Sequence, residues 1–243
     1  KNEYRMKIWL ISLFDPTPMD KSSTGRFIGI AEAAVAKGHE VVHFTSTFRH
    51  TSKKQRFEQD ELIKINDKYT VRYIRSMDYE KNMRPRRFYA HYDFAKKLVA
   101  ELDTLDKPDI IFFSMPPLST GFEVSKWAKA NNIPYVLDII DPWPDSFIKD
   151  VPESLKGLGK FIIAPFAMKL DRILAYASAL TAISSEYVNW ALSYTERKDI
   201  PNQFYYPAVD FGAVQQALSK HSSKEKGDKL RLIYAGSLAS SYD

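Results

Sequence analysis

The chain has 243 residues, of which 44% are hydrophobic and 27% charged, a composition typical of a soluble globular protein. It contains no cysteine, which excludes disulfide bonds and cysteine-ligated zinc sites and is consistent with a reducing compartment. The formal net charge is a modest +5, and no apolar stretch reaches the roughly 18 residues that a membrane-spanning helix needs.

Short apolar runs alternate with helical patterns in the first half of the chain. A continuous apolar run at 7–14 predicts a buried strand, and residues 24–37 carry apolar side chains at helical spacing up to Gly38. Residues 40–45 predict a second strand, so this region forms a βαβ unit. A further strand is expected at 70–75, followed by a long amphipathic helix at 87–105.

The same alternation continues through the second half. Strands are expected at 109–114, 134–140, 180–183 and 204–206. Helices are expected at 118–131, at 158–177 with a kink or break at Pro165, and at 185–192. This order of elements predicts an α/β fold, a Rossmann-like parallel sheet with helices on both faces.

The composition changes near the C-terminus. Residues 219–229 are short, polar and charged, as in an interdomain linker, and 230–237 read as a strand followed by a glycine turn. We therefore expect an N-terminal domain at 1–218, a linker at 219–229, and at 230–243 the first strand of a second, truncated Rossmann-like domain.

Open parallel sheets bind ligands at the carboxyl ends of their strands, so the segments that follow strands are candidate sites. The loop after the first strand lacks the G-x-G-x-x-G dinucleotide fingerprint. The helix that begins near Gly25 still offers free backbone N–H groups to a phosphate, and Arg26 would add a positive charge. The alternative is an ordinary surface loop and helix start.

Two further segments follow strands. After 109–114, two prolines that include Pro117 fix a turn, and Ser119 or Thr120 is expected to cap the next helix. After 180–183, Glu186 opens a short helix and is placed to contact a ligand. A structural role is the alternative for Pro117, Ser119 and Glu186 alike.

The most informative segment is Asp141-Pro-Trp-Pro-Asp145, at the mouth of the strand at 134–140. Asp141 can accept a proton from a substrate hydroxyl, and Trp143 can stack on a sugar face. The alternative makes Asp141 a turn residue and Trp143 part of the core, and Asp138 within the strand has a weaker case. No histidine pair has metal-ligand spacing, and neither a P-loop nor G-x-S-x-G is present. We therefore expect no metal and no cofactor.

Basic residues gather in two places, at 49–56 and at 84–97, with aromatic residues among the second group. A plain solvated surface is one interpretation. An anionic membrane or a diphosphate-bearing substrate is another, whereas no nucleic-acid motif lies beside the clusters.

Taken in order, a series of segments resembles the retaining glycosyltransferases of family 4, which have the GT-B fold. The segments are Met6-Lys-Ile-Trp-Leu-Ile-Ser, Lys37-Gly-His-Glu-Val, Asp109-Ile-Ile-Phe-Phe-Ser-Met-Pro-Pro-Leu, Ile140-Asp-Pro-Trp-Pro-Asp, Ala179-Leu-Thr-Ala-Ile-Ser-Ser, Tyr206-Pro-Ala-Val-Asp and Leu232-Ile-Tyr-Ala-Gly. The Pro-Pro-Leu and Asp-Pro-Trp-Pro pieces look most like the subgroup that builds bacterial capsule and O-antigen.

The resemblance implies that the N-terminal domain binds the acceptor, while a C-terminal domain binds most of the nucleotide-sugar donor. It implies transfer with retention to a polyprenyl-diphosphate-linked sugar, without a metal, by a cytoplasmic enzyme at the inner face of the plasma membrane. Many family members carry a histidine where this chain has Asp141, so the catalytic assignment to Asp141 departs from the family pattern. The fragment alone is expected to be inactive.

Two alternatives stay open. A sugar-nucleotide 2-epimerase shares the GT-B architecture, but it calls for acidic and histidine groups around the nucleotide cleft, where histidines are few. A non-catalytic Rossmann-like binding module would fold by itself and end near Pro207, and the expected strand at 230 argues against it.

Overall fold

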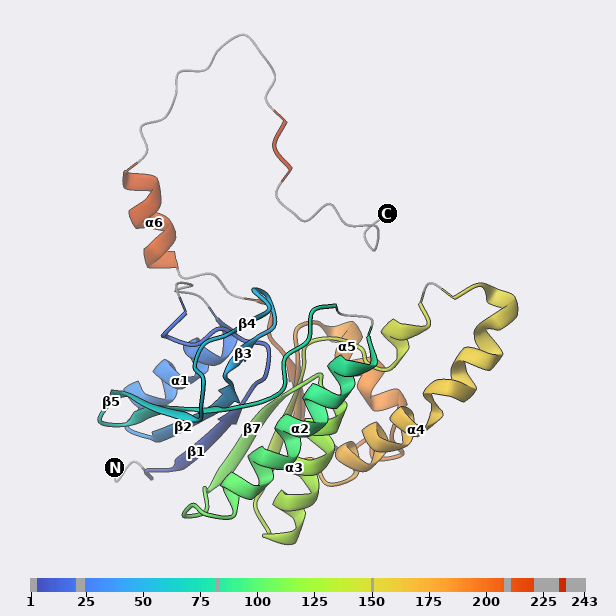
Figure 1. Ribbon diagram of the computed structural model, residues 1–243, viewed down its shortest axis with the longest axis horizontal. Helices are drawn as coiled ribbons and strands as arrows, with labels where there is room; N and C mark the ends of the chain where they lie inside the picture. Colours follow the sequence, from blue (N-terminus) through green and yellow to red (C-terminus); the bar gives the residue numbers. More distant parts are fainter. Residues whose placement is uncertain are drawn as a thin grey trace. The chain divides into compact units, whose positions relative to one another are not determined.

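The computed structural model describes residues 4–20, 25–81, 84–149, 151–207, 211–220 and 232–234 (Figure 1). The chain divides into two compact units, Lys1–Ala208 and Val209–Asp243. In the second unit the structure describes one helix, α6 (Phe211–Ser219), which the sequence pattern did not lead us to expect. Most of the predicted linker and of the strand expected from 230 onward lies outside the described residues, so both remain predictions.

The first unit is built on an eight-stranded sheet with the order β10-β9-β8-β7-β1-β2-β6-β5. Its neighbouring strands are parallel except for β5, which pairs antiparallel with β6. The strands are β1 (Lys7–Ile11), β2 (Glu40–Ser46), β5 (Glu61–Asn66), β6 (Tyr69–Ile74), β7 (Ile110–Met115), β8 (Tyr135–Ile139), β9 (Ala179–Ala182) and β10 (Asn202–Phe204). The strand order reverses between β1 and β7, and such a reversal opens a crevice at the carboxyl edge of the sheet.

Helices cover both faces of this sheet. On one face Phe27 and Ala31 of α1 (Arg26–Ala36) pack with Leu10 of β1. The other face carries α2 (Pro85–Leu102), α3 (Leu118–Ala130), α4 (Lys156–Ala175) and α5 (Ser185–Ser193), whose buried side chains pack with Trp9 and Ile11. Successive side chains of a strand point to opposite faces of the sheet, so Trp9 and Ile11 enter one core layer and Leu10, between them, enters the other. The predicted α/β, Rossmann-like fold class is confirmed.

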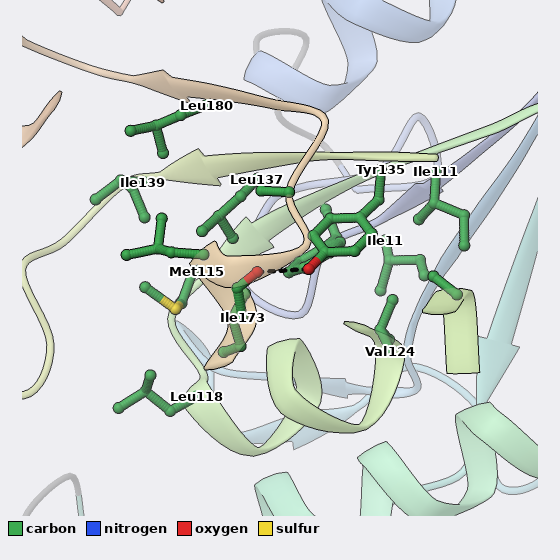
Figure 2. Close-up of a cluster of buried hydrophobic side chains, with 14 of the residues drawn as sticks. Ile11, Ile111, Met115, Leu118, Val124, Tyr135, Leu137, Ile139, Ile173 and Leu180 are labelled. Carbon is green, nitrogen blue, oxygen red and sulfur yellow. Dashed lines mark hydrogen bonds between the residues drawn. The ribbon is translucent and has the colours of Figure 1, made fainter. Parts of the chain in front are cut away.

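The larger core layer fills the space between β7, β8 and the helices α3 and α4 (Figure 2). Every second residue of β8, namely Tyr135, Leu137 and Ile139, is buried in this layer. The Tyr135 hydroxyl donates a hydrogen bond of 2.5 Å to the carbonyl oxygen of Ile173, near the end of α4, as the dashed line in Figure 2 shows. This bond satisfies a polar group inside an otherwise apolar layer.

Two small features complete the carboxyl side of the first unit. A hairpin of β3 (Phe48–Arg49) and β4 (Lys54–Gln55) follows β2, and two short 3-10 turns, η1 (Asp145–Phe147) and η2 (Glu153–Leu155), lead from β8 to α4.

Three features differ from the sequence-based expectation. Strand β5 was missed because it is an edge strand whose apolar residues, Ile63 and Ile65, alternate with exposed ones and give only a short signal. The hairpin strands are two residues each, which leaves no periodicity to detect. Of the kink or break expected at Pro165, a break is wrong, because α4 continues through it with Ile163 and Leu170 buried on either side. None of the described helices is long and apolar enough to cross a membrane.

Candidate functional site

Side chains gather at the carboxyl edge of the sheet in two groups, one on each face. Alternation along β8 explains the division. Leu137 and Ile139 point toward α3 and α4, so Asp138 between them faces α1. Asp141 and Trp143 follow in the loop beyond the strand.

The first group, which we call the Arg26 cluster, lies on the α1 face. Arg26 donates two hydrogen bonds to the Asp138 carboxylate, at 2.7 Å from Nε and 2.8 Å from Nη2, and a third of 2.9 Å from Nη1 to the carbonyl oxygen of Tyr205. Thr181, which the register of β9 places opposite Asp138, donates to the same carboxylate at 2.6 Å. Asp138 is fully buried, so this paired geometry compensates for its desolvation.

Asp15, in the loop after β1, completes the Arg26 cluster. Burial and the negative charge of Asp138 raise the pKa of Asp15 to about 7, against the opposing effects of Arg26 and of the Phe27 backbone N–H. Two carboxyl groups therefore share one guanidinium, and one of them holds a proton near neutral pH.

Gly25, predicted as a phosphate-binding position, precedes α1 as its N-cap with an extended backbone. A Cβ atom at this position would lie 2.7 Å from Cγ of Pro16. The close approach of the loop to the start of α1 therefore provides a packing reason for glycine here. Arg26, the other residue predicted to bind phosphate, forms an ion pair with Asp138.

The second group surrounds a cavity of about 130 Å³ on the opposite face. Three of the predicted site residues, Pro117, Ser119 and Trp143, are brought together in its wall. The remaining lining residues come from α2, α3 and α4: Phe88, His91, Tyr92, Leu118, Phe166 and Lys169. The wall thus combines aromatic faces with a few polar groups, as in sites that bind small polar molecules.

Ser119 and Thr120 do not cap α3 as expected. The N-cap residue is Pro117, and it makes no side-chain hydrogen bond. Ser119 lies in the first turn and faces the cavity, whereas the Thr120 hydroxyl is buried without a partner among the described residues.

Asp141 is linked to the cavity through Trp143, whose indole Nε1–H donates a 3.0 Å hydrogen bond to its carboxylate. Burial raises the pKa of Asp141, and this bond and the positive charge of Arg87 oppose the rise. Trp143 is 4% exposed and packs in the core, with the Arg87 guanidinium 4.8 Å from its ring centroid. The raised pKa makes Asp141 a stronger base than an ordinary aspartate.

Glu186 lies elsewhere on the carboxyl edge, in the first turn of α5 after the Ser184 N-cap. Hydrogen bonds from its own backbone N–H and from the Ser184 hydroxyl lower the pKa of Glu186. Its carboxylate therefore stabilises the helix start, and no described contact joins it to the cavity or to the Arg26 cluster.

Sequence reasoning missed Arg87 and His91 of α2, which face this second group, and Asp15 of the first. The basic composition of 84–97 was the available signal for Arg87. Arg87 interacts with Asp141, 54 positions away in the sequence, and an interaction over this separation produces no local pattern that sequence analysis could detect. Among the described residues, no group of three or more histidine, aspartate or glutamate side chains is arranged to hold a metal ion.

No protein-family model matches the sequence, and no curated protein is significantly similar to it. Solved structures are similar in fold. Sucrose-phosphate synthase from Thermosynechococcus elongatus matches with a TM-score of 0.52 and 14% identity, over 88% of this chain and 96% of that structure. An α,α-trehalose-phosphate synthase (UDP-forming) from Burkholderia vietnamiensis matches with a TM-score of 0.57 and 10% identity, over 90% of this chain and 52% of that one.

The catalytic domain of starch synthase IV from Arabidopsis thaliana, bound to ADP and acarbose, matches with a TM-score of 0.52 and 10% identity, over 86% of this chain and 53% of that one. The chain spans about half the length of the last two structures. The likeness is one of fold, and it shows that the mostly parallel sheet with flanking helices matches the GT-B fold of these proteins.

Proposed function

We propose that this chain forms the acceptor-binding half of a glycosyltransferase. The enzyme transfers a sugar, with retention, from a nucleotide-sugar donor to a polyprenyl-diphosphate-linked sugar, in the synthesis of a bacterial surface polysaccharide such as capsule or O-antigen. It works in the cytoplasm at the inner face of the plasma membrane. The family 4 assignment rests on the sequence resemblance, and the fold is consistent with it.

The observation that carries the proposal is the position of Asp141. It lies at the carboxyl edge of a GT-B-like sheet, its pKa is raised by burial, and Trp143 connects it to a cavity that also presents Pro117 and Ser119. A carboxylate in this position accepts a hydrogen bond from an acceptor hydroxyl and orients it for attack. With retention, the leaving diphosphate itself takes the proton, so the protein mainly positions the acceptor and stabilises charge.

The donor class is supported by the structures with the same fold, one of which is bound to ADP and another of which is a UDP-forming synthase. In the proposed enzyme a C-terminal domain holds most of the donor. The chain by itself is therefore expected to catalyse no transfer.

The solvent face of α4 supports a lipid-linked acceptor. Leu158, Phe161, Ile162 and Met168 recur at helical spacing and are exposed, Phe161 to 78%. Lys160 and Lys169 on the same helix supply positive charge next to these apolar side chains. This combination fits the headgroup region of an anionic bilayer, with Phe161 and Ile162 inserted below the phosphates.

Vesicle co-sedimentation of the full-length protein tests the membrane contact. We expect binding to vesicles that contain phosphatidylglycerol and a large loss of binding in the double variant Phe161→Gln, Ile162→Gln. The control is Leu62→Gln, an exposed leucine on β5. Equal binding of the double variant and the control would remove this support for a lipid acceptor.

The activity test uses the full-length protein with UDP-, GDP- and dTDP-sugars and a polyprenyl-diphosphate-linked sugar. Acceptor-dependent release of the nucleotide, followed by mass spectrometry, is the expected result and names the donor. Epimerisation of a UDP-sugar without acceptor would favour the 2-epimerase instead, and no reaction across the panel would favour a binding module.

The variant Asp141→Asn tests the role of the carboxylate. We expect a fall in kcat of about 10²-fold, because a neutral amide orients the acceptor hydroxyl less well than a carboxylate. The unfolding midpoint should not change, because the side-chain oxygen still accepts the indole hydrogen bond. Asp106→Asn, an exposed change before β7 at the opposite edge of the sheet, is the matched control. Near-normal turnover of Asp141→Asn would contradict this role and leave Asp141 as a structural residue of the turn.

A further inference from the structure

The two basic segments of the sequence meet in space beside the cavity. Lys53, in the β3–β4 hairpin, and Arg87, on α2, belong to different segments and both contact Tyr79, the lysine over its ring and the arginine at its hydroxyl. We call Lys53, His50, Tyr79, Arg87 and His91 the cationic cluster.

Contacts within the cationic cluster are close. Nδ1 of His50 lies 2.5 Å from the Tyr79 hydroxyl oxygen and 3.1 Å from Nζ of Lys53. The same Nζ lies 4.6 Å from the centroid of the Tyr79 ring, and Arg87 hydrogen-bonds to the Tyr79 hydroxyl. His91, four residues after Arg87 on the same helix face, packs with its ring 5.8 Å from that of Tyr79.

The cluster holds an excess of positive charge. Burial and the charge of Arg87 lower the pKa of Lys53. Burial, Lys53 and Arg87 together lower the pKa of His50 to about 4, and the pKa of His91 falls to about 3 for the same reasons with His50 added. Two cations thus stand among two neutral imidazoles, with Asp141 as the carboxylate that interacts with Arg87.

The backbone places Lys53 with unusual geometry. It has a φ of +56°, in the left-handed region that glycine and asparagine prefer, at the turn of the hairpin. From this turn its Nζ reaches the ring of Tyr79.

His91 connects the cationic cluster to the cavity. It is 2% exposed, lines the cavity with Ser119 and Trp143, and its Nε2 atom has no hydrogen-bond partner among the described residues. Buried polar atoms in folded proteins are normally paired, so His91 leaves one hydrogen-bonding atom unpaired next to the cavity that it lines.

We propose that the cationic cluster binds the diphosphate of the lipid-linked acceptor, with Lys53 and Arg87 as its charged donors. His91 contacts the sugar that enters the cavity beside it. The identity of the acceptor rests on the proposed function, whereas diphosphate binding rests on the cluster alone. The Arg26 cluster has a different charge balance, because its one guanidinium faces both Asp15 and Asp138.

The test measures binding to the full-length protein by calorimetry, with inorganic pyrophosphate, farnesyl diphosphate and UDP as probes at matched ionic strength in sodium chloride. We expect pyrophosphate and farnesyl diphosphate to bind and Lys53→Gln and Arg87→Gln each to weaken binding by roughly 10-fold or more, the effect of losing a hydrogen bond to a charged group. Lys54→Gln, at the neighbouring exposed lysine, and Arg84→Gln, at the exposed start of α2, are the controls, with changes below about two-fold.

A second readout is the imidazole of His50, assigned in NMR spectra by the signal lost in His50→Gln. Pyrophosphate between Lys53 and Arg87 neutralises the charges that lower the pKa of His50, so binding is expected to raise that pKa. Arg87→Gln removes packing from Trp143. If this variant fails to fold, the affinity of Lys53→Gln and the pKa of His50 still decide whether the site exists.

The outcomes separate the two proposals. Unchanged pyrophosphate affinity in Lys53→Gln, or equal losses in Lys53→Gln and Lys54→Gln, would overturn the site even in an active transferase. UDP binding that depends on Lys53 as strongly as farnesyl diphosphate binding would overturn the assignment to the acceptor. Binding with the expected dependence on Lys53 in a protein without transferase activity would leave the site standing and refute the proposed function.

Discussion

The pH dependence of the free energy of unfolding tests whether Asp15, in the Arg26 cluster, is protonated in the folded protein. The pKa of Asp15 is about 7 in the folded protein, against an ordinary value of 3.8 that applies to the unfolded chain. Between these values the folded state holds a proton that the unfolded state releases. The contribution of Asp15 to stability is therefore fully present below pH 3.8 and is lost as the pH rises to 7.

The perturbation is Asp15→Asn, which keeps the shape of the side chain and removes its charge. Each pKa unit corresponds to 1.36 kcal/mol, so the pH-dependent destabilisation by Asp15 has an upper limit of about 4 kcal/mol above pH 7. Part of the side chain is exposed to solvent, which screens its charge, and we expect about 2 kcal/mol. Relative to the native protein, the variant gains about three quarters of this amount between pH 4.5 and pH 8, because the unfolded state already releases its proton near pH 3.8.

Denaturant unfolding of both proteins across this pH range gives the difference directly. The control is Asp20→Asn. Burial raises the pKa of Asp20, but hydrogen bonds from Arg56 and the Thr17 backbone N–H outweigh it and lower the pKa overall. The ionised Asp20 therefore stabilises the folded state above pH 3.8. Asp20→Asn should lower the free energy of unfolding by the same amount at every pH between 4.5 and 8. A difference between Asp15→Asn and the native protein that does not change with pH would refute the assignment of a proton to Asp15.

The remaining predictions concern the same face of the sheet. Asp138→Ala removes one partner of a buried ion pair and should lower the free energy of unfolding by about 3–5 kcal/mol, because Arg26 then lacks its carboxylate. A loss below about 1 kcal/mol in denaturant unfolding would show that Asp15 ionises and replaces it. Gly25→Ala should cost about 1–3 kcal/mol through the clash with Pro16, whereas Gly29→Ala, which meets open space in the middle of α1, should stabilise by about 0.5–1 kcal/mol. Equal thermal midpoints for these two variants would contradict the packing explanation of Gly25.

Strands and helices with clear apolar periodicity could be predicted from the sequence. Residues 7–14 and 109–114 are continuous apolar runs because β1 and β7 are covered on both faces, and the helix at 118–131 shows its buried side in Val124 and Ala128. The edge strand β5 was not predicted, because only one of its faces packs and its apolar signal is short.

The candidate site was predictable in part, for a related reason. Once the strand ends were known, the position of Asp141 followed from the rule that the carboxyl ends of parallel strands share one edge. The neighbours of Asp141 did not follow from it. Arg87 belongs to a helix whose basic residues look alike in sequence, and only its packing on Trp143 distinguishes it from the exposed Arg84 and Arg86.

The sequence by itself determined the alternation of strands and helices, the layered architecture and the edge of the sheet where the candidate site lies, because these depend on the spacing of apolar residues along the chain. Only the tertiary structure decided which side chains meet. Asp138 faces α1 because of its place in the two-residue period of β8, and it pairs with Arg26, 112 positions away, because of the strand order. Lys53 and Arg87 likewise meet through the positions of a hairpin and a helix on the folded sheet. Such contacts depend on long-range register, which local periodicity does not encode.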